Sequence, residues 1–503
     1  MSVPVAPTAW QRLDPRMLLV HPIKEVLKFL PILLGLLIAG GASGAGPWTL
    51  LGVGIPVGLG VVRYLTTTYR IGDGRVELQR GLLQRHTLST PVDRVRTVDL
   101  TASPIHRVLG LATVVIGTGS VASDADERLE LDALPRDEAA RLRAELLRTA
   151  VPAGAVPGAP GAPGAPGAVG AVAEQEQVVA RFSPRWLWYA PFSGTVLVGL
   201  GAIVGGGLQL TESIEIRVSE DDLAGIDRAF VLALVVGGVL LVTLLAVGGY
   251  LVTNGGFVIA RHGAAWHVRR GLLTRRETSI DVARLAGATV GEPAALRLAR
   301  GRRVGAIVTG LSGSQSSSAV LLPPAPRGIG YDVASAVLGT PAPVTGPLLP
   351  HGRAATTRRF SRALLGSLPF IAAVVAVVVA GAPAWLLATA AVPVAAALAL
   401  AWDRARALGH AFLDGHVVMR SGSVLRSRDA LAAGHVIGWN QRATWFQRRA
   451  GLVSLAATTA GGSGQVRVPD VPAEDAITLA EAATPGLITQ FCVNLPSAST
   501  ARS

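Results

Sequence analysis

Side chains with acid–base or metal-binding chemistry are sparse in this sequence, and their spacing assembles no known centre. Among the nine histidines, His262 and His267 are five positions apart and His410 and His416 are six apart, with no carboxylates spaced to complete a metal site. Cys492 is the single cysteine, so the chain has neither a thiol pair nor an intrachain disulfide. We therefore predict no metal site.

Motifs for phosphate binding and covalent catalysis are also missing from the sequence. A phosphate-binding loop ends in Gly-Lys-Ser/Thr, and no lysine follows Lys28. The glycine-rich runs 117–119 and 461–464 are typical of turns, and no nucleophile elbow occurs. We expect no catalytic residue, no cofactor and no enzymatic activity.

Arginine gives the chain its charge. The formal net charge is +13, and Lys24 and Lys28 are the only lysines. A basic surface of this kind suits nucleic acid or anionic lipid, and the apolar stretches described next favour lipid. We expect no nucleic-acid partner. The arginines that could contact lipid headgroups or a protein partner are Arg63, Arg70, Arg75, Arg80, Arg94, Arg107, Arg358, Arg359, Arg404 and Arg406.

Three pairs of long apolar stretches interrupt the sequence. Half of all residues are hydrophobic, and crossing a bilayer takes about 20 apolar residues in a helix. Buried helices of a large soluble core are the competing interpretation, but the near absence of charge favours membrane spans. Trp186, Trp188 and Tyr189 suit an aromatic belt at the bilayer surface. The predicted spans are 27–41, 48–64, 186–208, 230–252, 364–380 and 385–402.

Charge on the flanks predicts the orientation of these spans. Arginine and lysine flank the outer ends of each pair, whereas the connection 209–229 inside the second pair is acidic. The positive-inside rule therefore places the soluble segments and both termini in the cytoplasm of a multi-pass plasma-membrane protein. No ionisable residue lies in the middle of a predicted span, which counts against a proton or ion carrier.

A soluble segment follows each apolar pair, and we name these segments module 1 (66–150), module 2 (253–340) and module 3 (403–490). In module 1, Val76 and Leu78 alternate after a Gly-Asp-Gly turn, which predicts a β-hairpin. Pro135 precedes a helix with Ala139 and Leu142 on one face. Modules 2 and 3 end in similar predicted helices at 331–338 and 472–483, so the chain is predicted to contain an internal repeat.

Module 1 resembles a known bacterial family. The residues that carry the resemblance run from Tyr69-Arg70-Ile71 to Gly81-Leu82-Leu83, with Pro91-Val92-Asp93-Arg94-Val95 and 106–111. They are similar to the bacterial pleckstrin-homology-like domain that membrane spans flank, and the whole chain resembles members with three such domains and six spans. Module 2 departs at 296–299, where it lacks the equivalent of Gly110, and module 3 has 423–424 in place of the Leu-Leu pair.

The resemblance implies an α+β membrane protein. Three transmembrane helical hairpins would each precede a small pleckstrin-homology-like bent antiparallel sheet capped by a C-terminal helix. The expected segments are a cytoplasmic N-terminus (1–25), hairpin 1 (26–65), module 1, a Pro/Gly/Ala linker (151–180), hairpin 2 (181–252), module 2, a linker (341–362), hairpin 3 (363–402), module 3 and a tail (491–503).

For function, we expect a membrane scaffold or interaction protein. Its partners would be the lipid bilayer and other membrane proteins, in a homo- or hetero-oligomer. The family resemblance implies roles in envelope stress or in resistance to membrane-active peptides. A transporter or export component, and a sensor of anionic lipid, are the alternatives that the sequence leaves open.

Overall fold

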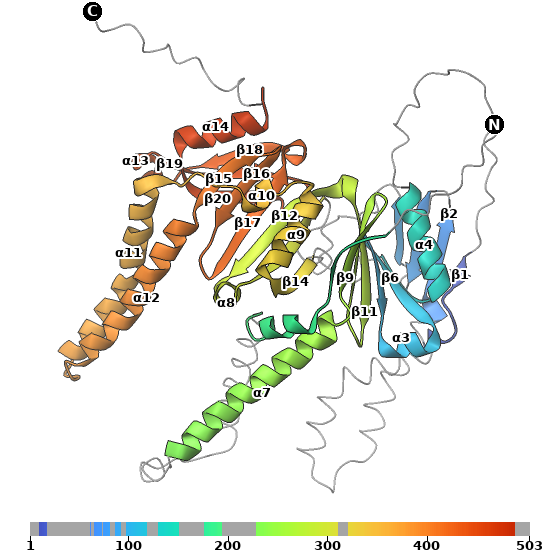
Figure 1. The fold of residues 1–503 in the computed structure, drawn as a ribbon, viewed down its shortest axis with the longest axis horizontal. Helices are drawn as coiled ribbons and strands as arrows, with labels where there is room; N and C mark the ends of the chain where they lie inside the picture. Colours follow the sequence, from blue (N-terminus) through green and yellow to red (C-terminus); the bar gives the residue numbers. More distant parts are fainter. Residues whose placement is uncertain are drawn as a thin grey trace, which may run out of the picture. The chain divides into compact units, whose positions relative to one another are not determined.

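The structure is a computed structural model of the full chain (Figure 1). It describes residues 10–17, 61, 65–72, 74–80, 86–91, 97–117, 129–149, 176–193, 228–309 and 320–487. The chain forms two compact units. Unit 1 comprises 1–181, 252–284 and 310–318, and unit 2 comprises 182–251, 285–309 and 319–503. The predicted segments of the chain do not map one to one onto these units, because module 2 contributes residues to both.

Unit 1 opens with a four-stranded antiparallel sheet in the order β1-β2-β3-β4. Val76 and Leu78 of β3 are buried, as the alternating pattern predicted, and Gly74 turns the chain between β2 and β3 with a φ of 69°. A residue with a side chain is strained at that angle, so glycine suits this turn. The strands are β1 (Gln11–Arg12), β2 (Thr68–Gly72), β3 (Arg75–Arg80) and β4 (His86–Pro91).

A seven-stranded sheet completes unit 1, in the order β7-β6-β5-β11-β10-β9-β8. Strands of module 1 form one half of it and strands near or within module 2 form the other, joined where β5 pairs antiparallel with β11. The elements are β5 (Thr97–Ala102), β6 (Leu111–Gly117), β7 (Leu129–Pro135), β8 (Gln177–Arg181), β9 (Val258–His262), β10 (Ala265–Arg270) and β11 (Arg275–Asp281), with α3 (Pro104–Leu109), α4 (Arg136–Thr149) and the short 3-10 helix η4 (Val282–Arg284).

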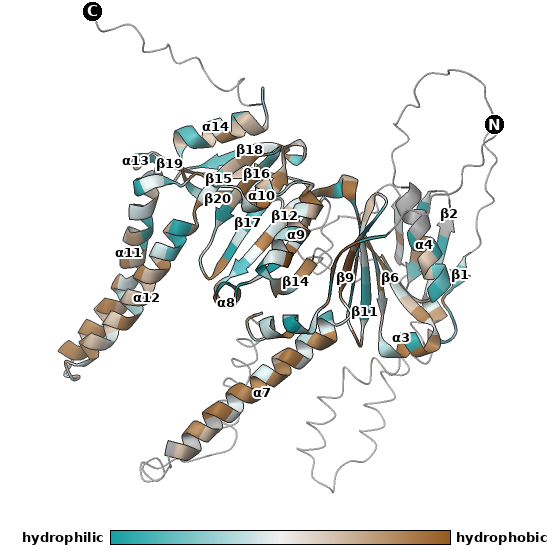
Figure 2. Cartoon of the chain, in the orientation of Figure 1, coloured by the Kyte–Doolittle hydropathy of each residue, from teal (hydrophilic) through white to brown (hydrophobic). Residues whose placement is uncertain are grey.

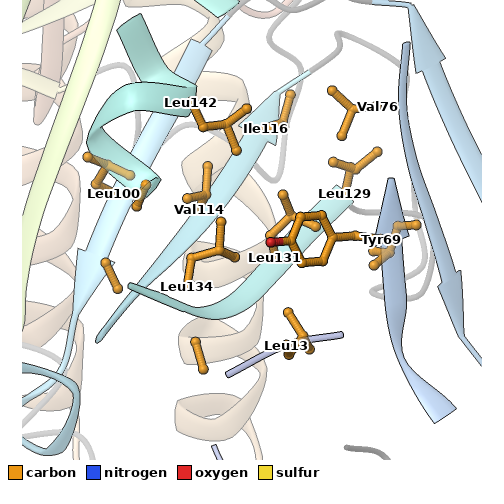
Figure 3. Packing of buried hydrophobic residues seen from close by; sticks show 14 of the residues in the cluster. Leu13, Tyr69, Val76, Leu100, Val114, Ile116, Leu129, Leu131, Leu134 and Leu142 are labelled. Carbon is orange, nitrogen blue, oxygen red and sulfur yellow. The ribbon is translucent and has the colours of Figure 1, made fainter. Parts of the chain in front are cut away.

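Figure 3 shows the core of unit 1, which gathers side chains from both sheets and from α4. Leu142 of α4 covers the buried strand residues Val114 and Leu131, as expected for a helix that closes a bent sheet. The Tyr69 hydroxyl donates a hydrogen bond to Glu138 of α4 at 3.0 Å. Burial, together with this carboxylate, raises the pKa of Tyr69 above its usual range.

Unit 2 contains a six-stranded sheet in the order β14-β13-β12-β17-β16-β15 and a three-stranded sheet in the order β18-β19-β20. Its strands are β12 (Leu285–Pro293), β13 (Gly301–Val308), β14 (Val320–Pro326), β15 (Gly409–Leu413), β16 (His416–Ser421), β17 (Leu425–Ala432), β18 (Gly438–Arg442), β19 (Leu452–Thr458) and β20 (Gln465–Pro472). Its short helices are η3 (Pro184–Tyr189), α8 (Ala294–Leu298), α9 (Arg327–Leu338), α10 (Ala342–Thr345), η6 (Ala433–His435), α13 (Trp445–Arg449) and α14 (Ala473–Ala483).

The six-stranded sheet joins two modules where β12 of module 2 pairs antiparallel with β17 of module 3. Gly287 is required at this junction, because a Cβ there would collide with the carbonyl oxygen of Ala430. Thr289 donates a side-chain hydrogen bond across the junction to Asp429 at 2.7 Å. Burial raises the pKa of Asp429, and the two hydrogen bonds from Thr289 and Ser427 oppose that shift.

Three helices are long and apolar enough to cross a membrane: α7 (Arg228–Asn254), α11 (Gly352–Val379) and α12 (Leu386–Ala407). Figure 2 shows hydrophobic residues along most of each helix, and many of their large apolar side chains are exposed. Helices α11 and α12 lie side by side, joined by a turn in which Gly381 has a φ of 107°. Helix α7 matches the predicted span 230–252, α11 contains most of 364–380, and α12 matches 385–402.

The predicted spans differ from the structure in two further respects. Residues 184–189 form the 3-10 helix η3 rather than the start of a span, and Trp186 is only 1% exposed, so the interfacial position predicted for it is wrong. Trp188 is 67% exposed. Helix α11 begins at Gly352, twelve residues before the predicted span, because its basic first turns are helical too. The first pair, apart from residue 61, and residues 194–208 lie outside the described residues.

Two buried histidines join α11 to module 3 within unit 2. The ring nitrogens of His351, directly before α11, and His410, in β15, lie 3.2 Å apart. Backbone hydrogen bonds between Leu349 and His410 hold the two segments together. Burial is the largest cause lowering the pKa of each histidine, and for His351 the pKa falls to about 4.

This pair predicts acid-sensitive stability. A histidine with a lowered folded-state pKa keeps its full stabilising contribution above the unfolded value of about 6.5 and loses it as the pH falls. For His351, with a pKa of about 4, the loss approaches about 3 kcal/mol at that pH. Thermal unfolding of the detergent-purified chain between about pH 4 and about pH 8 measures this slope.

His351→Gln should flatten the pH dependence, whereas His435→Gln, a histidine outside the pair, serves as the matched control. An equal slope in wild type and His351→Gln would contradict the assignment.

Candidate membrane-facing site

Three short helices expose apolar side chains at one type of position in the fold. Each of them directly follows the first strand in the second half of its module: α3 follows β5, α8 follows β12 and α13 follows β18. Ser103 caps α3, and Thr444 and Gln447 form a reciprocal capping box on α13. These caps fix the direction of helices only five or six residues long.

The exposed residues on these helices are large and hydrophobic. Val108 of α3 is 86% exposed and Leu298 of α8 is 84% exposed. On α13, Trp445 and Phe446 are 58% and 65% exposed, with their rings packed edge to face at 5.0 Å. Single exposed hydrophobic residues are ordinary, but here they recur on three matching helices. A surface that meets lipid would explain the recurrence.

In unit 1, α3 is linked to the hairpin between β10 and β11. The Arg107 guanidinium donates a 2.7 Å hydrogen bond to the carbonyl oxygen of Leu272, and Leu272 and Leu273 are themselves exposed. The backbone N–H of Leu272 in turn donates to the carbonyl oxygen of Val252, near the end of α7. Exposed apolar side chains and an arginine are thereby held beside the end of a candidate span.

In unit 2, α8 is linked to the hairpin between β16 and β17 in the same way. Arg297 donates to the carbonyl oxygen of Ser423 at 3.1 Å, and its guanidinium also binds both carboxylate oxygens of Asp403 at 3.0 and 2.9 Å. Arg426 contacts the same carboxylate at 2.6 Å. Asp403 lies near the end of α12, so two arginines tie the hairpin to a second candidate span.

Helix α13 lies beside α11, the third candidate span. Arg358 of α11 donates to the Thr444 hydroxyl at 3.3 Å. Arg449 lies over the ring of Trp445 at 5.7 Å. An arginine stacked on an exposed tryptophan suits the headgroup layer, where the ring meets apolar chains and the cation meets phosphate. We name these exposed apolar and basic residues the rim of their unit: those of α3 and the β10–β11 hairpin in unit 1, and those of α8, α13 and the β16–β17 hairpin in unit 2.

Arg358 and Arg359 also converge on one buried carboxylate. They contact Asp470 of β20 at 2.9 and 2.6 Å, and the Gln447 side chain donates to it at 2.8 Å. Asp470 is 1% exposed and has a φ of 58°, at an irregularity in the β19–β20 pairing. A buried carboxylate needs such partners. These two arginines therefore anchor α11 on module 3.

Arg404 and Arg406 are exposed in the last turns of α12, and Arg406 lies 3.9 Å from the centre of the Trp402 ring. This arrangement is also typical of the bilayer interface. Basic side chains at a helix C-terminus are favoured by the helix dipole. Both side chains are exposed and so are accessible to headgroups or to a partner, but that contact stays a prediction.

The other predicted arginines lie elsewhere. Arg70 pairs with Glu77 at 2.6 Å and lies over the Trp10 ring, and Arg75 is exposed on β3. Arg107 belongs to the rim. The residues Arg63 and Arg94, and the side chain of Arg80, lie outside the described part of the structure.

Sequence reasoning missed the acidic residues that organise the site. Asp403 directly follows an apolar run, and a carboxylate so close to a predicted span end was a signal that could have marked it. Asp470 carried no comparable signal, because its two arginine partners lie more than a hundred positions away in the chain. Sequence reasoning also missed Arg297 and Arg426, because their role follows only from their contacts with Asp403.

A second polar cluster lies in unit 1, around a shallow cleft lined by Arg143, Glu277 and His267. Glu277 contacts Arg143 at 3.1 Å, and two further arginines of the same hairpin contact it as well. Burial first, and then the Arg143 charge, lowers the pKa of His267 to about 4. Among the described residues, no group of three or more His, Cys, Asp or Glu side chains could hold a metal ion.

Comparison with known proteins finds a family for two regions of the chain. A family model described as "Bacterial PH domain" matches residues 25–150 and 362–484. These two regions belong to the bacterial PH domain family. No curated protein and no solved structure matches the chain. Each PH region begins at or near an apolar pair and ends in or just after the closing helix of a module, so the family pattern includes the stretches that supply α11 and α12.

The two PH regions exclude module 2. Its elements nevertheless follow the same order, with β9–β11, then β12, a short helix, β13, β14 and the closing helix α9. Its arginine–carbonyl contact between α8 and the next hairpin also matches that of the first PH region.

Removing the carboxylate at Asp403 should release the hairpin between β16 and β17. Asp403→Asn weakens the charge-assisted bonds of Arg297 and Arg426, and we expect a loss of about 2 kcal/mol of stability. Hydrogen exchange at residues 422–426 measures the local effect. Glu481→Gln, on the exposed face of α14, is the matched control, and unchanged exchange in Asp403→Asn would refute the tie.

The rim predicts a specific depth in lipid. In a Cys492→Ser background, a spin label at Leu298→Cys should collide more often with oxygen than with a water-soluble nickel complex in proteoliposomes, because oxygen partitions into the bilayer. A label at Ile477→Cys, exposed on α14, should show the reverse. Equal accessibility ratios at the two positions would contradict a lipid-facing rim.

Proposed function

We propose that this protein is a multi-pass membrane scaffold whose PH-like modules form a platform on the cytoplasmic side of the plasma membrane. One observation supports the proposal above all others: consecutive modules share continuous sheets, and the rim of those sheets is tied to the ends of candidate spans. A continuous sheet suits a rigid support. The contacts between the hairpins and the ends of α7 and α12 would hold each sheet at a fixed distance from the lipid.

The orientation follows from charge on described residues. The first turns of α11 carry Arg353, Arg358, Arg359 and Arg362, and the last turns of α12 carry Arg404 and Arg406. Both basic ends lie next to module 3, as the positive-inside rule requires of a cytoplasmic module. Six spans would keep all modules and both termini on that side; of these, the first pair except residue 61, and residues 194–208 of the second pair, lie outside the described residues.

The proposed scaffold is not an enzyme. The polar clusters that the structure describes have structural geometry: Asp403 and Asp470 each hold arginines that anchor a helix. Its partners would be the bilayer and other membrane proteins or further copies of itself. The link to envelope stress or to membrane-active peptides rests on the family resemblance alone.

Anionic-lipid binding is a second candidate, favoured by the stacked pairs Arg406–Trp402 and Arg449–Trp445. Each arginine near an anionic surface contributes about 1 kcal/mol. Transport or export gains no comparable support, because residues 231–249, 363–379 and 386–402 contain no Asp, Glu, Lys, Arg or His.

The scaffold proposal predicts association. The full chain, purified in mild detergent, should have a protein mass by light scattering above that of one 51.7 kDa chain, or should capture defined partners when crosslinked in membranes before extraction. The variant Glu481→Gln, which removes an exposed charge on α14 outside the rim, should behave as wild type. A strictly monomeric particle without crosslinked partners would overturn the proposal.

A further inference from the structure

Among the described residues, two strand edges lack a partner at positions that form the junctions between modules elsewhere in the fold. In the part of the chain that the structure describes, β4 pairs only with β3, and β18 pairs only with β19. β4 is the third strand of the first half of module 1, and β18 is the first strand of the second half of module 3. The matching strands elsewhere are paired: β11 and β17 are third strands, and β5 and β12 are first strands.

The two internal junctions share one register. At the first, Arg275 lies opposite Ala102; at the second, Arg426 lies opposite Glu292. Arg275 lies five positions after the end of β10, and Arg426 lies five positions after the end of β16. Their partners each lie two positions before a short helix: Ala102 before α3 and Glu292 before α8. A repeated register indicates a specific contact, because a shift of one residue between the strands would move every side chain to the other face of the sheet.

The same rule can be applied to the two open edges. β3 ends at Arg80 and α13 begins at Trp445, so the rule places Thr87 opposite Gln441 and Ser89 opposite Trp439. The paired stretch would end with Thr90 opposite Gly438. Pro91, which has no N–H to donate, falls just beyond it and costs no hydrogen bond.

We propose that β4 of one copy pairs antiparallel with β18 of a second copy, in the register found at the two internal junctions. This proposal deepens the scaffold function by naming the partner as another copy of this chain. The association joins different surfaces of the two copies, so repetition generates a ring or a linear chain of copies.

Both strands carry little of what protects an edge, since Pro91 and Arg442 lie at the strand ends, at or beyond the limit of the stretch that would pair. β4 has the sequence His-Thr-Leu-Ser-Thr-Pro, without a charged Lys, Arg, Asp or Glu, and Thr87 and Ser89 are exposed. β18 exposes Gln441 and Arg442. Soluble proteins commonly blunt open edges with charge, a bulge or a covering segment. Backbone pairing with a second strand satisfies the N–H and C=O groups that both edges present.

A free arginine on α13 adds an independent indication. Arg107 and Arg297, each the fourth residue of its short helix, donate across a junction to the carbonyl oxygens of Leu272 and Ser423. Arg448 is the fourth residue of α13. It is exposed, and no side-chain hydrogen bond or ion pair connects it to the described residues. A second copy would supply the missing acceptor.

Cysteine crosslinking tests the register directly. In a Cys492→Ser background, Thr87→Cys and Gln441→Cys are introduced into separately tagged copies, which are co-expressed and oxidised in membranes. The expected product is a disulfide between the two tags. Thr87→Cys with Ile477→Cys is the control for random collision, and Ser89→Cys with Gln441→Cys tests a register shifted by two residues.

A charge series tests whether the contact holds the assembly together. Thr87 and Gln441 are exposed, so lysine at both positions should leave the fold intact and place like charges opposite each other. We expect Thr87→Lys with Gln441→Lys to reduce the mass by light scattering to that of one copy, and Thr87→Glu with Gln441→Lys to restore the assembly. Ile477→Lys is the matched control.

Each outcome decides the proposal. A disulfide no more frequent than in the collision control, or an assembly unaffected by paired lysines, overturns the β4–β18 contact while leaving a scaffold with another interface. A disulfide formed only within single chains also overturns it. A monomeric wild type that still captures other proteins rejects self-pairing but keeps the scaffold, whereas a monomer without partners rejects both.

Discussion

The structure depends on hydrogen bonding between strands that belong to different modules. β5 needs β11 and β12 needs β17, because each would otherwise present a row of unpaired N–H and C=O groups. Gly287 shows how closely the second pair must approach, since no larger residue fits beside Ala430. The three modules are therefore consecutive parts of shared sheets, and their boundaries in sequence are not boundaries of folding.

Much of this could be predicted from the sequence. The alternation at Val76 and Leu78 and the face formed by Ala139 and Leu142 gave the hairpin and the closing helix, because local periodicity reports which side of an element is buried. The apolar runs gave α7, α11 and α12. The family resemblance, confirmed at two regions, gave the mixed α+β class.

The remainder depends on contacts between distant residues, which periodicity does not encode. Nothing local in β11 indicates that its partner lies about 180 positions earlier in the chain, at β5. Among the predicted arginines, Arg107 lies in the rim and Arg404 and Arg406 are exposed on α12, because exposure follows from charge. Arg358 and Arg359 were predicted as surface contacts and instead converge on Asp470, since only the fold shows where a carboxylate is buried. Trp186 was misplaced for the same reason.

The split of module 2 between two sheets has a consequence for synthesis. β12 leaves the ribosome well over a hundred residues before β17, and two long apolar helices must be made and placed in between. During that interval the nascent chain carries an unfinished sheet whose next strand does not yet exist. Until β17 is made, the edge of β12 that it covers lacks its backbone partner, so this sheet can be completed only after α11 and α12 have been synthesised.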